Sequence, residues 1–551
     1  MPVVAFNVKD FEDRGYPVKR LQELLPSLGM EAEFSEGGEI KIETMPNRPD
    51  LLDFIGIVRA LDHFTGKRQP KENFYKIDKE PVLTIDVDPS VKKIRPYIAG
   101  IVAENVDFSG NLLKYAINFT NKFTETYGRK RRKLALGIHN LDMIKGNITY
   151  AAAEDGMMTP LDAKADMSFS EILKKSEKGI EYGGMYSSQK KPKLPFIRDG
   201  ERVLAVIPII QCEQTRAKED TKNIFIDITG TSEVAVENAA NMIAAALIYG
   251  GATVYPVTVN YGKSAVQTPE FREKQMKMSL RRAELTLGVA LGRHNIVGLA
   301  NKMGHTAAKY GNSILFFIPP YRLDVISERD LIEDVAIAFG YDNITPLPVT
   351  GVADGLAQDT AEQENRLATN MVGLGYTEAI NSILTNETAN FENMQRKGKE
   401  GEYVQIADAK TEQITMVRTD IVPCLMQNLS ISTNEKMPQR LFEIGRVFSL
   451  NGNTIKESSK LAFVAEHSKA NFAEIRSAVE AALKSSDVEG YRIEQSSDPS
   501  FIEGRCAKVV SGGTQIGIFG EIHPKVLLAF GLEEPVVAAE LTIIKEIKYE
   551  V

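Results

Sequence analysis

The spacing of hydrophobic and polar residues follows the same order in two distant stretches of the chain, residues 21–66 and 296–341. Each stretch predicts a helix, a glycine turn, a strand, a Pro-x-Arg-x-Asp turn and a closing apolar helix. The fixed residues of the two turns are Pro46, Arg48 and Asp50, matched by Pro320, Arg322 and Asp324. A matched turn between matched elements, with a gap of one residue before it, indicates an internal duplication.

The chain between the two copies predicts a separate α/β domain. Its strand-like runs are residues 82–87, 98–102, 203–210, 224–228 and 252–259, and its helical patterns are residues 112–127 and 234–249. After the second copy, the stretch TPLPVTGVADG (residues 345–355) is typical of a linker.

Beyond this linker, a helix near residues 362–374 precedes strand candidates at 379–384, 439–447, 460–464, 507–510 and 517–519. This order favours an antiparallel sheet with helices packed on one side. We therefore expect an α+β multidomain protein with domains at residues 1–80, 82–265, 268–346 and 350–551.

Length and composition limit the class of protein. A chain of 551 residues is too long for one core, and 43% hydrophobic and 25% charged residues are ordinary for a globular protein. Three widely spaced cysteines predict no disulfide framework and suggest a reducing compartment. The first residues do not have the pattern of a signal peptide, and no apolar run reaches the length of a membrane span. We expect a soluble, cytoplasmic protein without a membrane partner.

The charge is uneven along the chain. A net charge of −8 does not predict the broad basic surface of a nucleic-acid-binding protein. Residues 129–133 (RKRRK) nevertheless follow an aromatic stripe of Phe119, Phe123 and Tyr127 at helical spacing. Two interpretations stay open for this run, namely the solvated end of a helix and a local phosphate contact.

Only the second copy carries a group of acidic residues. Ser327 and Asp330 have the spacing of a capping box at the start of its last helix, and Gly340 ends that helix. Asp330, Glu333 and Asp334 stand at i, i+3 and i+4, which places three carboxylates on one helix face, with Asp324 in the turn before them. Oxygen ligands suit Mg²⁺. Acids are also favoured at helix N-termini without any metal, so both interpretations stay open.

A second candidate site is NIFIDITGT, residues 223–231, where a strand ends near Asp227 and Thr229 before a helix. Such a turn can present hydrogen-bonding groups to a small ligand, although both residues are also ordinary capping residues. The upstream run VLAVIPIIQC (residues 203–212) predicts a buried strand or the wall of an apolar pocket. Six histidines lie singly along the chain and are interpreted as structural or exposed, and no phosphate-binding glycine loop is found.

Several long segments together resemble one family. They are MPNRPDLLDFIGIVRAL, GRKRRKLALGIHNLD, FIDITGT, PPYRLDVISERDLIEDVAIAFGYDNI, MVRTDIVPCLMQNL, LFEIGRVF and FGEIHPKVLLAFGL. In family order and over essentially the whole chain, they resemble the β subunit of phenylalanine–tRNA ligase in its archaeal and eukaryotic form.

The resemblance implies a tetramer of two α and two β subunits, acting on the tRNA for phenylalanine. In that family the α subunit holds the class II active site and uses ATP. The β subunit has a catalytic-like class II antiparallel-sheet domain that lacks the active-site motifs, an α/β editing domain, and two small helix–strand–helix domains of a nucleic-acid-binding type. Class II active sites need an arginine motif on a strand and a glycine-rich strand–helix motif that ends in arginine. Neither motif is found in this sequence.

The resemblance also implies site residues. The Mg²⁺ ligands of the family fall on Asp324, Asp330, Glu333 and Asp334. The editing pocket, which hydrolyses mischarged tyrosyl-tRNA, falls on Leu204, Cys212, Asp227 and Thr229, and Cys212 stands where related proteins often have serine. The alternative function is a scaffold or tRNA-binding subunit without active editing. A free-standing ATP-dependent ligase is disfavoured by the missing motifs.

Overall fold

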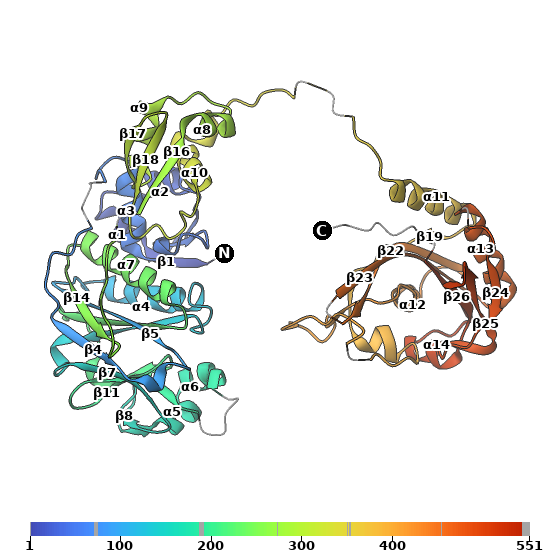
Figure 1. The fold of residues 1–551 in the computed structure, drawn as a ribbon, viewed down its shortest axis with the longest axis horizontal. Helices are drawn as coiled ribbons and strands as arrows, with labels where there is room; N and C mark the ends of the chain where they lie inside the picture. Colours follow the sequence, from blue (N-terminus) through green and yellow to red (C-terminus); the bar gives the residue numbers. More distant parts are fainter. Residues whose placement is uncertain are drawn as a thin grey trace. The chain divides into compact units, whose positions relative to one another are not determined.

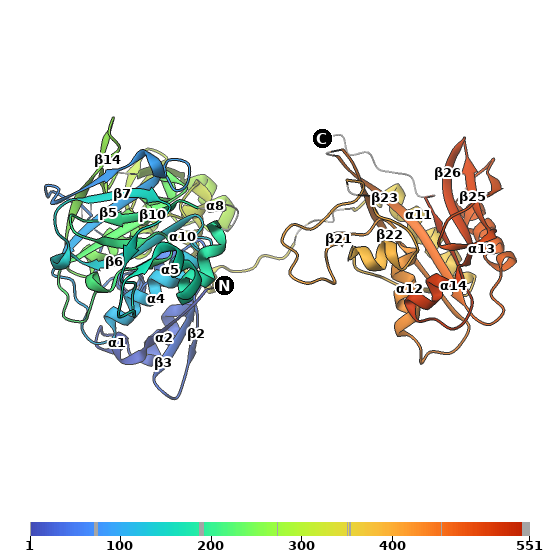
Figure 2. The ribbon, with the colours of Figure 1, turned by 90° about the horizontal axis from the view of Figure 1, so that it is seen from below.

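The computed structural model describes residues 2–70, 75–186, 192–272, 274–349, 351, 354–399, 401–452, 454–486 and 488–542 (Figures 1 and 2). The chain forms two compact units, Met1–Pro348 and Val349–Val551. Their boundary lies inside the predicted linker, residues 345–355. In the described part of the chain, no helix is both long and apolar enough to cross a membrane.

The first unit begins with the first copy of the duplicated fold. The strands β1 (Val3–Asn7), β2 (Glu31–Phe34) and β3 (Glu39–Glu43) form an antiparallel sheet in the order β1-β3-β2. The helices α1 (Val8–Glu12) and α2 (Val18–Ser27) precede β2, and a short 3-10 helix (Pro49–Leu52) leads into α3 (Phe54–Phe64).

The second copy repeats this arrangement. Its strands β16 (Lys274–Ser279), β17 (Thr306–Tyr310) and β18 (Ser313–Ile318) pair in the order β16-β18-β17, which matches β1-β3-β2. The helices are α8 (Leu280–Leu287), α9 (Arg293–Lys302) and α10 (Glu328–Phe339). The duplication is confirmed at the level of strand order.

The duplicated unit is longer than the sequence pattern predicted. Each copy also contains an earlier strand, β1 or β16, and its central strand is in fact a hairpin. The hairpins turn at Gly38 and Gly311, which adopt φ of +76° and +57°. Glycine adopts this conformation without the steric cost of a side chain, so the chain reverses there where a single strand was expected.

A large mixed sheet occupies the rest of the first unit. Among the described residues its strand order is β12-β11-β10-β7-β4-β14-β5-β13-β6, with β15 paired to β14. The strands are β4 (Leu83–Val87), β5 (Tyr97–Glu104), β6 (Leu134–Asn140), β7 (Ile148–Ala153), β10 (Leu194–Arg198), β11 (Val203–Val206), β12 (Ile210–Gln211), β13 (Ile224–Gly230), β14 (Thr253–Asn260) and β15 (Ala265–Thr268). Of the run 203–210, only Val203–Val206 form the predicted strand, and a turn at residues 207–209 separates it from β12.

Two helices on one face of this sheet join it to the first copy. The helices α4 (Leu112–Glu125) and α7 (Glu233–Tyr249) pack on β5, β6, β13 and β14, and both also contact the first copy (Figure 1). The smaller elements β8 (Met157–Met158), β9 (Met167–Ser168), α5 (Phe169–Lys175) and α6 (Glu177–Tyr182) follow β7. The first copy, the sheet and their shared helices form one apolar core.

The basic run 129–133 lies in a turn after α4. Arg129, Lys130 and Arg131 adopt positive φ values of +51°, +51° and +64°. Arg131 is half-buried, and its Nη1 donates to the carbonyls of Pro208 and Ile209, both at 2.9 Å. The run is therefore not simply a solvated helix end, because one of its arginines holds two loops of the sheet together.

The second unit contains an antiparallel sheet, as predicted, with one parallel edge strand. Its described strands β19 (Thr377–Glu378), β22 (Gln439–Asn451), β23 (Thr454–Glu466), β24 (Arg492–Gln495), β25 (Phe501–Ser511), β26 (Thr514–Ile522) and β27 (Val536–Leu541) take the order β19-β22-β23-β27-β26-β25-β24. Only the short pairing of β19 with β22 is parallel in this part of the chain. The strands β20 (Leu384–Thr385) and β21 (Met416–Val417) pair separately.

The expectation that helices cover one side of this sheet is wrong. The helices α11 (Asp359–Gly373) and α13 (Phe472–Ser485) cover one face, whereas α12 (Val422–Ile431) and α14 (Pro524–Phe530) cover the other (Figures 1 and 2). The physical reason is in the inner strand β23, where every residue of Leu461–Ala465 is fully buried. Both faces of that strand are apolar, so both must be covered.

The duplicated turns form a buried ionic contact within the first unit. Arg48 makes two bonds of 2.9 Å to Asp50, and Arg322 makes the equivalent bonds to Asp324 at 2.9 and 2.7 Å. The copies also meet directly, with Arg48 Nε 3.9 Å from Asp324 Oδ1. Two parallel bonds between a planar guanidinium and a carboxylate fix the geometry of each turn and neutralise the charge of its aspartate.

The Arg322→Met variant tests this contact. It leaves two buried carboxylates without their cation, so we expect the first unit to lose about 3–5 kcal/mol of stability. The exposed Arg329 on α10 supplies the matched control, and Arg329→Met should change stability by less than about 0.5 kcal/mol. Native-state hydrogen exchange of the β17 and β18 amides in the full chain measures the change in stability of each variant. Equal protection in the two variants would contradict the structural role of Arg322.

Candidate functional site

The acids of the second copy are arranged around an arginine. Arg322 is buried, and its Nη2 lies 2.7 Å from both Asp324 Oδ2 and Asp334 Oδ2. His305 Nε2 lies 2.7 Å from the same oxygen of Asp334. Although burial opposes ionisation, the Arg322 guanidinium holds the pKa of Asp334 well below its usual range. Two of the predicted Mg²⁺ ligands are therefore neutralised by the protein itself.

The other two acids have different environments. Asp330 caps α10 as predicted, and its Oδ2 accepts from the backbone N–H groups of Ile326 and Ser327 at 2.8 and 2.6 Å. Gly340 ends the helix, also as predicted. Glu333 is exposed, whereas Asp334, one residue later, is 4% exposed. Of the three acids predicted for this helix face, Asp330 thus caps the helix, Asp334 is paired inside the protein and Glu333 is exposed.

This arrangement does not fit a magnesium ion. Among the residues that the structure describes, no group of three or more His, Cys, Asp or Glu side chains is placed to hold a metal. The spacing of the acids alone does not show that Arg322, in the turn before the helix, supplies the neutralising charge. The Mg²⁺ site on Asp324, Asp330, Glu333 and Asp334 stays a prediction of the resemblance.

The second candidate site lies on β13, the strand next to β6 at one end of the large sheet, and within that strand instead of in the turn after it that the sequence predicted. Asp227 and Thr229 are two residues apart on β13, so their side chains point to the same face. His139 on the neighbouring strand β6 places Nε2 3.0 Å from Asp227 Oδ1. Arg95 donates through Nε to the hydroxyl of Thr229 at 3.0 Å and through Nη2 to its carbonyl at 2.8 Å.

A chain of hydrogen bonds continues from His139. Its Nδ1 lies 2.8 Å from Thr215 Oγ1, and that hydroxyl lies 3.1 Å from the sulfur of Cys212. The backbone N–H of Cys212 donates to the carbonyl of Leu204 at 2.7 Å. Leu204, Cys212 and Asp227 are therefore connected through His139 and Thr215, whereas Thr229 lies beside Asp227 on β13 and is bonded to Arg95.

All four predicted residues are enclosed in this conformation. Leu204 and Thr229 are fully buried, and Cys212 and Asp227 are each 1% exposed. Leu204 and Cys212 belong to an apolar cluster with Phe225. The polar groups are satisfied by one another, as buried polar groups must be. The site thus holds its acid and hydroxyls in fixed orientations.

A glycine on β6 makes room for Asp227. Gly137 faces Asp227 in the sheet register. A Cβ atom at Gly137 would lie 2.3 Å from Gln211 Nε2 and 2.5 Å from Asp227 Oδ1, closer than side chains tolerate. Gly137 and His139 both lie in the segment GRKRRKLALGIHNLD, but nothing in the sequence alone placed that segment beside β13.

The pH dependence of stability tests the environment of Asp334. Its pKa is lowered in the folded protein, so its contribution to stability is fully present above the unfolded value of about 3.9 and is lost as pH falls further. Asp334→Asn should destabilise the chain at pH 7 and flatten the loss of stability below about pH 4. Urea unfolding at several pH values measures this, with Glu333→Gln as the exposed control. If both variants follow the wild-type profile, Asp334 is not paired as the structure has it.

Family models match residues 109–246 ("B3/4 domain"), 276–341 ("tRNA synthetase B5 domain") and 345–543 ("Phenylalanyl tRNA synthetase beta chain CLM domain"). The phenylalanine–tRNA ligase beta subunit of Archaeoglobus fulgidus is 34% identical over 549 residues, covering 98% of each chain. That of Methanocaldococcus jannaschii is 35% identical over 539 residues, covering 95% of this chain and 96% of its own.

A solved structure is also similar. It is an N-terminal fragment of the phenylalanyl-tRNA synthetase beta subunit from Pyrococcus horikoshii, with a TM-score of 0.58 and 31% identity. The match covers 61% of this chain and 99% of that fragment.

Proposed function

The chain belongs to the family of phenylalanine–tRNA ligase beta subunits, and on that premise we propose that its large-sheet domain hydrolyses tyrosyl-tRNA formed in error. The chain is thus part of an aminoacyl-tRNA synthetase, whose catalytic role lies in the alpha subunit. We further propose that two copies of each subunit assemble, and that the alpha subunit uses ATP to attach phenylalanine to its tRNA.

The observation that carries the editing proposal is the buried contact between His139 and Asp227. It lies in residues 109–246, which the B3/4 domain model matches. A carboxylate is costly to bury and is retained only with a compensating partner. Here the partner is a histidine whose other ring nitrogen is itself held by Thr215. Such a fixed and oriented carboxylate is suited to recognise one hydroxyl or ammonium group.

The need for editing follows from substrate chemistry. Tyrosine differs from phenylalanine by one hydroxyl, and an apolar pocket rejects that addition only about 10²-fold. A second site that accepts the hydroxyl and hydrolyses the ester supplies the missing discrimination. Apolar residues around Phe225 and Leu204 suit the ring of tyrosine, and Asp227 suits its polar group.

Each residue has a distinct task in this proposal. Asp227 Oδ1 is held by His139, so Oδ2 can accept a hydrogen bond from the hydroxyl or ammonium group of the substrate. His139 is a positioning residue, because both of its ring nitrogens are already engaged within the protein. The attacking nucleophile is water, which breaks the ester bond between tyrosine and the tRNA. Arg95 fixes the strand end at Thr229.

The Asp227→Ala variant tests the proposal in the assembled alpha–beta complex. Loss of a hydrogen bond to a charged group costs about 1.5–3 kcal/mol, so deacylation of tyrosyl-tRNA should slow by roughly 10- to 150-fold. Charging of tRNA with phenylalanine should be unchanged, because that reaction occurs at the alpha subunit. Asp220→Ala, at an exposed acid in the same domain, is the matched control.

Two results would remove the proposal. If Asp227→Ala deacylates tyrosyl-tRNA as fast as the control, Asp227 is not in the site. If the wild-type complex itself does not deacylate tyrosyl-tRNA, the alternative function holds. The chain is then a scaffold or tRNA-binding subunit without active editing. Cys212→Ser should retain activity, since a hydroxyl can replace the sulfur beside Thr215.

Magnesium is a separate part of the proposal. The four acids of the second copy do not converge on a metal site among the described residues, so no step of the reaction is assigned to an ion there. Equilibrium dialysis of the full chain with Mg²⁺, compared with Asp330→Asn and Glu333→Gln, decides whether these acids bind the ion.

A further inference from the structure

The turn between α4 and β6, residues 126–133, carries a cluster of exposed positive charges and is called the basic turn below. Arg129, Lys130 and Arg132 are exposed, and among the described residues no ion pair joins any of the three to a carboxylate. Residues 126–141 contain no Asp or Glu. In a chain with a net charge of −8, the basic turn thus keeps a local positive charge that its own segment does not neutralise.

The backbone of the basic turn is held in an unusual conformation. Arg129, Lys130 and Arg131 have φ values of +51°, +51° and +64°, and this left-handed region costs free energy for residues with a side chain. The N–H groups of Lys130 and Arg131 donate to the carbonyls of Glu125 and Thr124, at 2.8 and 2.9 Å. Such strain persists only where surrounding contacts enforce it, and it is concentrated at sites that hold a ligand.

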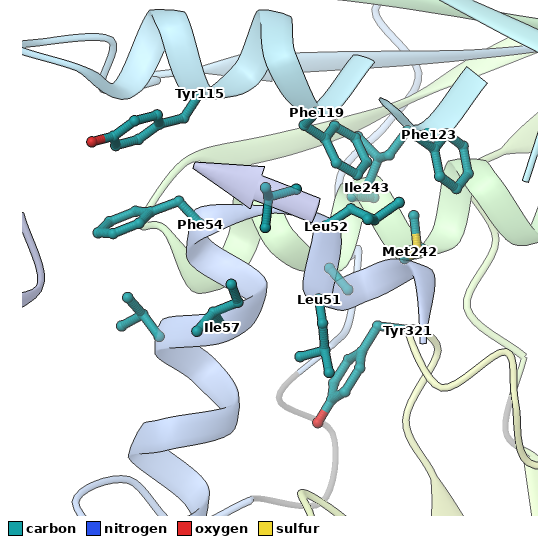
Figure 3. Packing of buried hydrophobic residues seen from close by; sticks show 14 of the residues in the cluster. Leu51, Leu52, Phe54, Ile57, Tyr115, Phe119, Phe123, Met242, Ile243 and Tyr321 are labelled. Atoms are coloured by element: carbon teal, nitrogen blue, oxygen red, sulfur yellow. The ribbon is translucent and has the colours of Figure 1, made fainter. Parts of the chain in front are cut away.

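The aromatic stripe that precedes the basic turn fixes its position. Figure 3 shows Phe119 and Phe123 pointing from α4 into the core, beside Met242 and Ile243 of α7. The ring of Phe123 is stacked on that of Phe119 at 5.3 Å and on that of Tyr127, the second residue of the turn, at 5.1 Å. The stripe is therefore part of the core, and it connects the basic turn to that core through stacked rings.

A buried arginine joins the basic turn to the strand of the proposed editing site. Arg95 is 3% exposed, and its Nη1 donates to the carbonyls of Arg131 and Arg132 at 3.0 and 3.3 Å. The same guanidinium donates to the hydroxyl and the carbonyl of Thr229 at 3.0 and 2.8 Å. The exposed cations are therefore fixed beside the end of β13 that carries Thr229.

The basic turn borders the proposed editing site on two sides. Leu134, which follows the turn, lies opposite Gly230, so Asp227 is three residues, or about 10 Å, along β13 from that end. On the other side, Arg131 Nη1 donates to two carbonyls of the loop between β11 and β12. In an aminoacylated tRNA one ribose separates the ester from the first phosphate, so an ester bound near Asp227 brings phosphates toward the turn.

We propose that the basic turn binds the phosphates of the single-stranded 3′ end of tRNA while the aminoacyl ester occupies the editing site. Arg129 and Arg132 each offer a planar guanidinium that can bind a phosphate through two parallel bonds, and Lys130 adds a point charge. Contacts of this kind follow the backbone of a single strand without reading its sequence. The inference rests on the proposed editing function for the destination of the ester, whereas RNA binding is measured independently of hydrolysis.

Fluorescence anisotropy with the full chain tests the phosphate contacts. The probe is a short single-stranded RNA, labelled at its 5′ end, whose 3′ end carries tyrosine through an amide that is not hydrolysed. The double variant Arg129→Gln/Arg132→Gln should bind it at least about tenfold more weakly. The slope of log Kd against log salt concentration should fall by about 1.4, because each phosphate contact with a single strand contributes about 0.7.

The matched control is Lys218→Gln/Lys222→Gln. It removes two exposed cations from the segment before β13, at the opposite end of that strand, and should change neither the affinity nor the slope. The proposal fails if the wild-type chain does not bind the RNA, if the arginine variant binds it as tightly as the control, or if its affinity falls with an unchanged salt slope. Loss of the alpha subunit from the variant on gel filtration would make the turn a subunit contact and would also overturn the proposal.

Deacylation kinetics of the alpha–beta complex separate this inference from the editing proposal. In Arg129→Gln/Arg132→Gln the KM for tyrosyl-tRNA should rise at least about tenfold with kcat unchanged, because the bound ester still meets Asp227. A fall in kcat at unchanged KM would mean that the turn shapes the site without binding RNA, which overturns the inference. If the wild-type complex does not deacylate tyrosyl-tRNA but the variant chain loses RNA binding as expected, only the editing proposal fails and the phosphate contact stands.

Discussion

The first unit depends on the buried pairing of arginine and aspartate in its duplicated turns. In each copy an arginine binds an aspartate two residues later through two parallel bonds, and Arg48 also approaches Asp324 in the other copy. Charges in a low-dielectric interior are tolerated only when they are paired in this way. Each turn carries its own ion pair, and the approach of Arg48 to Asp324 joins the two turns in one buried cluster of charges.

The same pairing decides the chemistry of the acidic helix. An acidic face without cations would attract a metal ion, but Arg322 reaches both Asp324 and Asp334. His305, in the turn between α9 and β17, also contacts Asp334, so the buried carboxylate has partners from two other segments of the copy. The first copy has no counterpart of Asp334. There Asp50 pairs with a second arginine, Arg59, in addition to Arg48. The two copies thus share a turn and differ in what surrounds it.

The strand β13 separates two environments. One face presents Asp227 and Thr229 to His139 and Arg95, in a network of buried polar groups. The other face presents Ile226 to α4, α7 and a cavity at the first copy. Because side chains alternate along a strand, one short segment contributes to both environments without mixing them.

Local patterns in the sequence determined the duplication, the capping of α10 by Asp330, its end at Gly340 and the segment around Asp227. These depend on residues close in the chain, where spacing alone fixes geometry. Tertiary structure alone decided that His139 meets Asp227, 88 residues later, and that helices cover both faces of the second sheet. Strand order and register are set by contacts between distant segments, and periodicity within one segment carries no information about its neighbour.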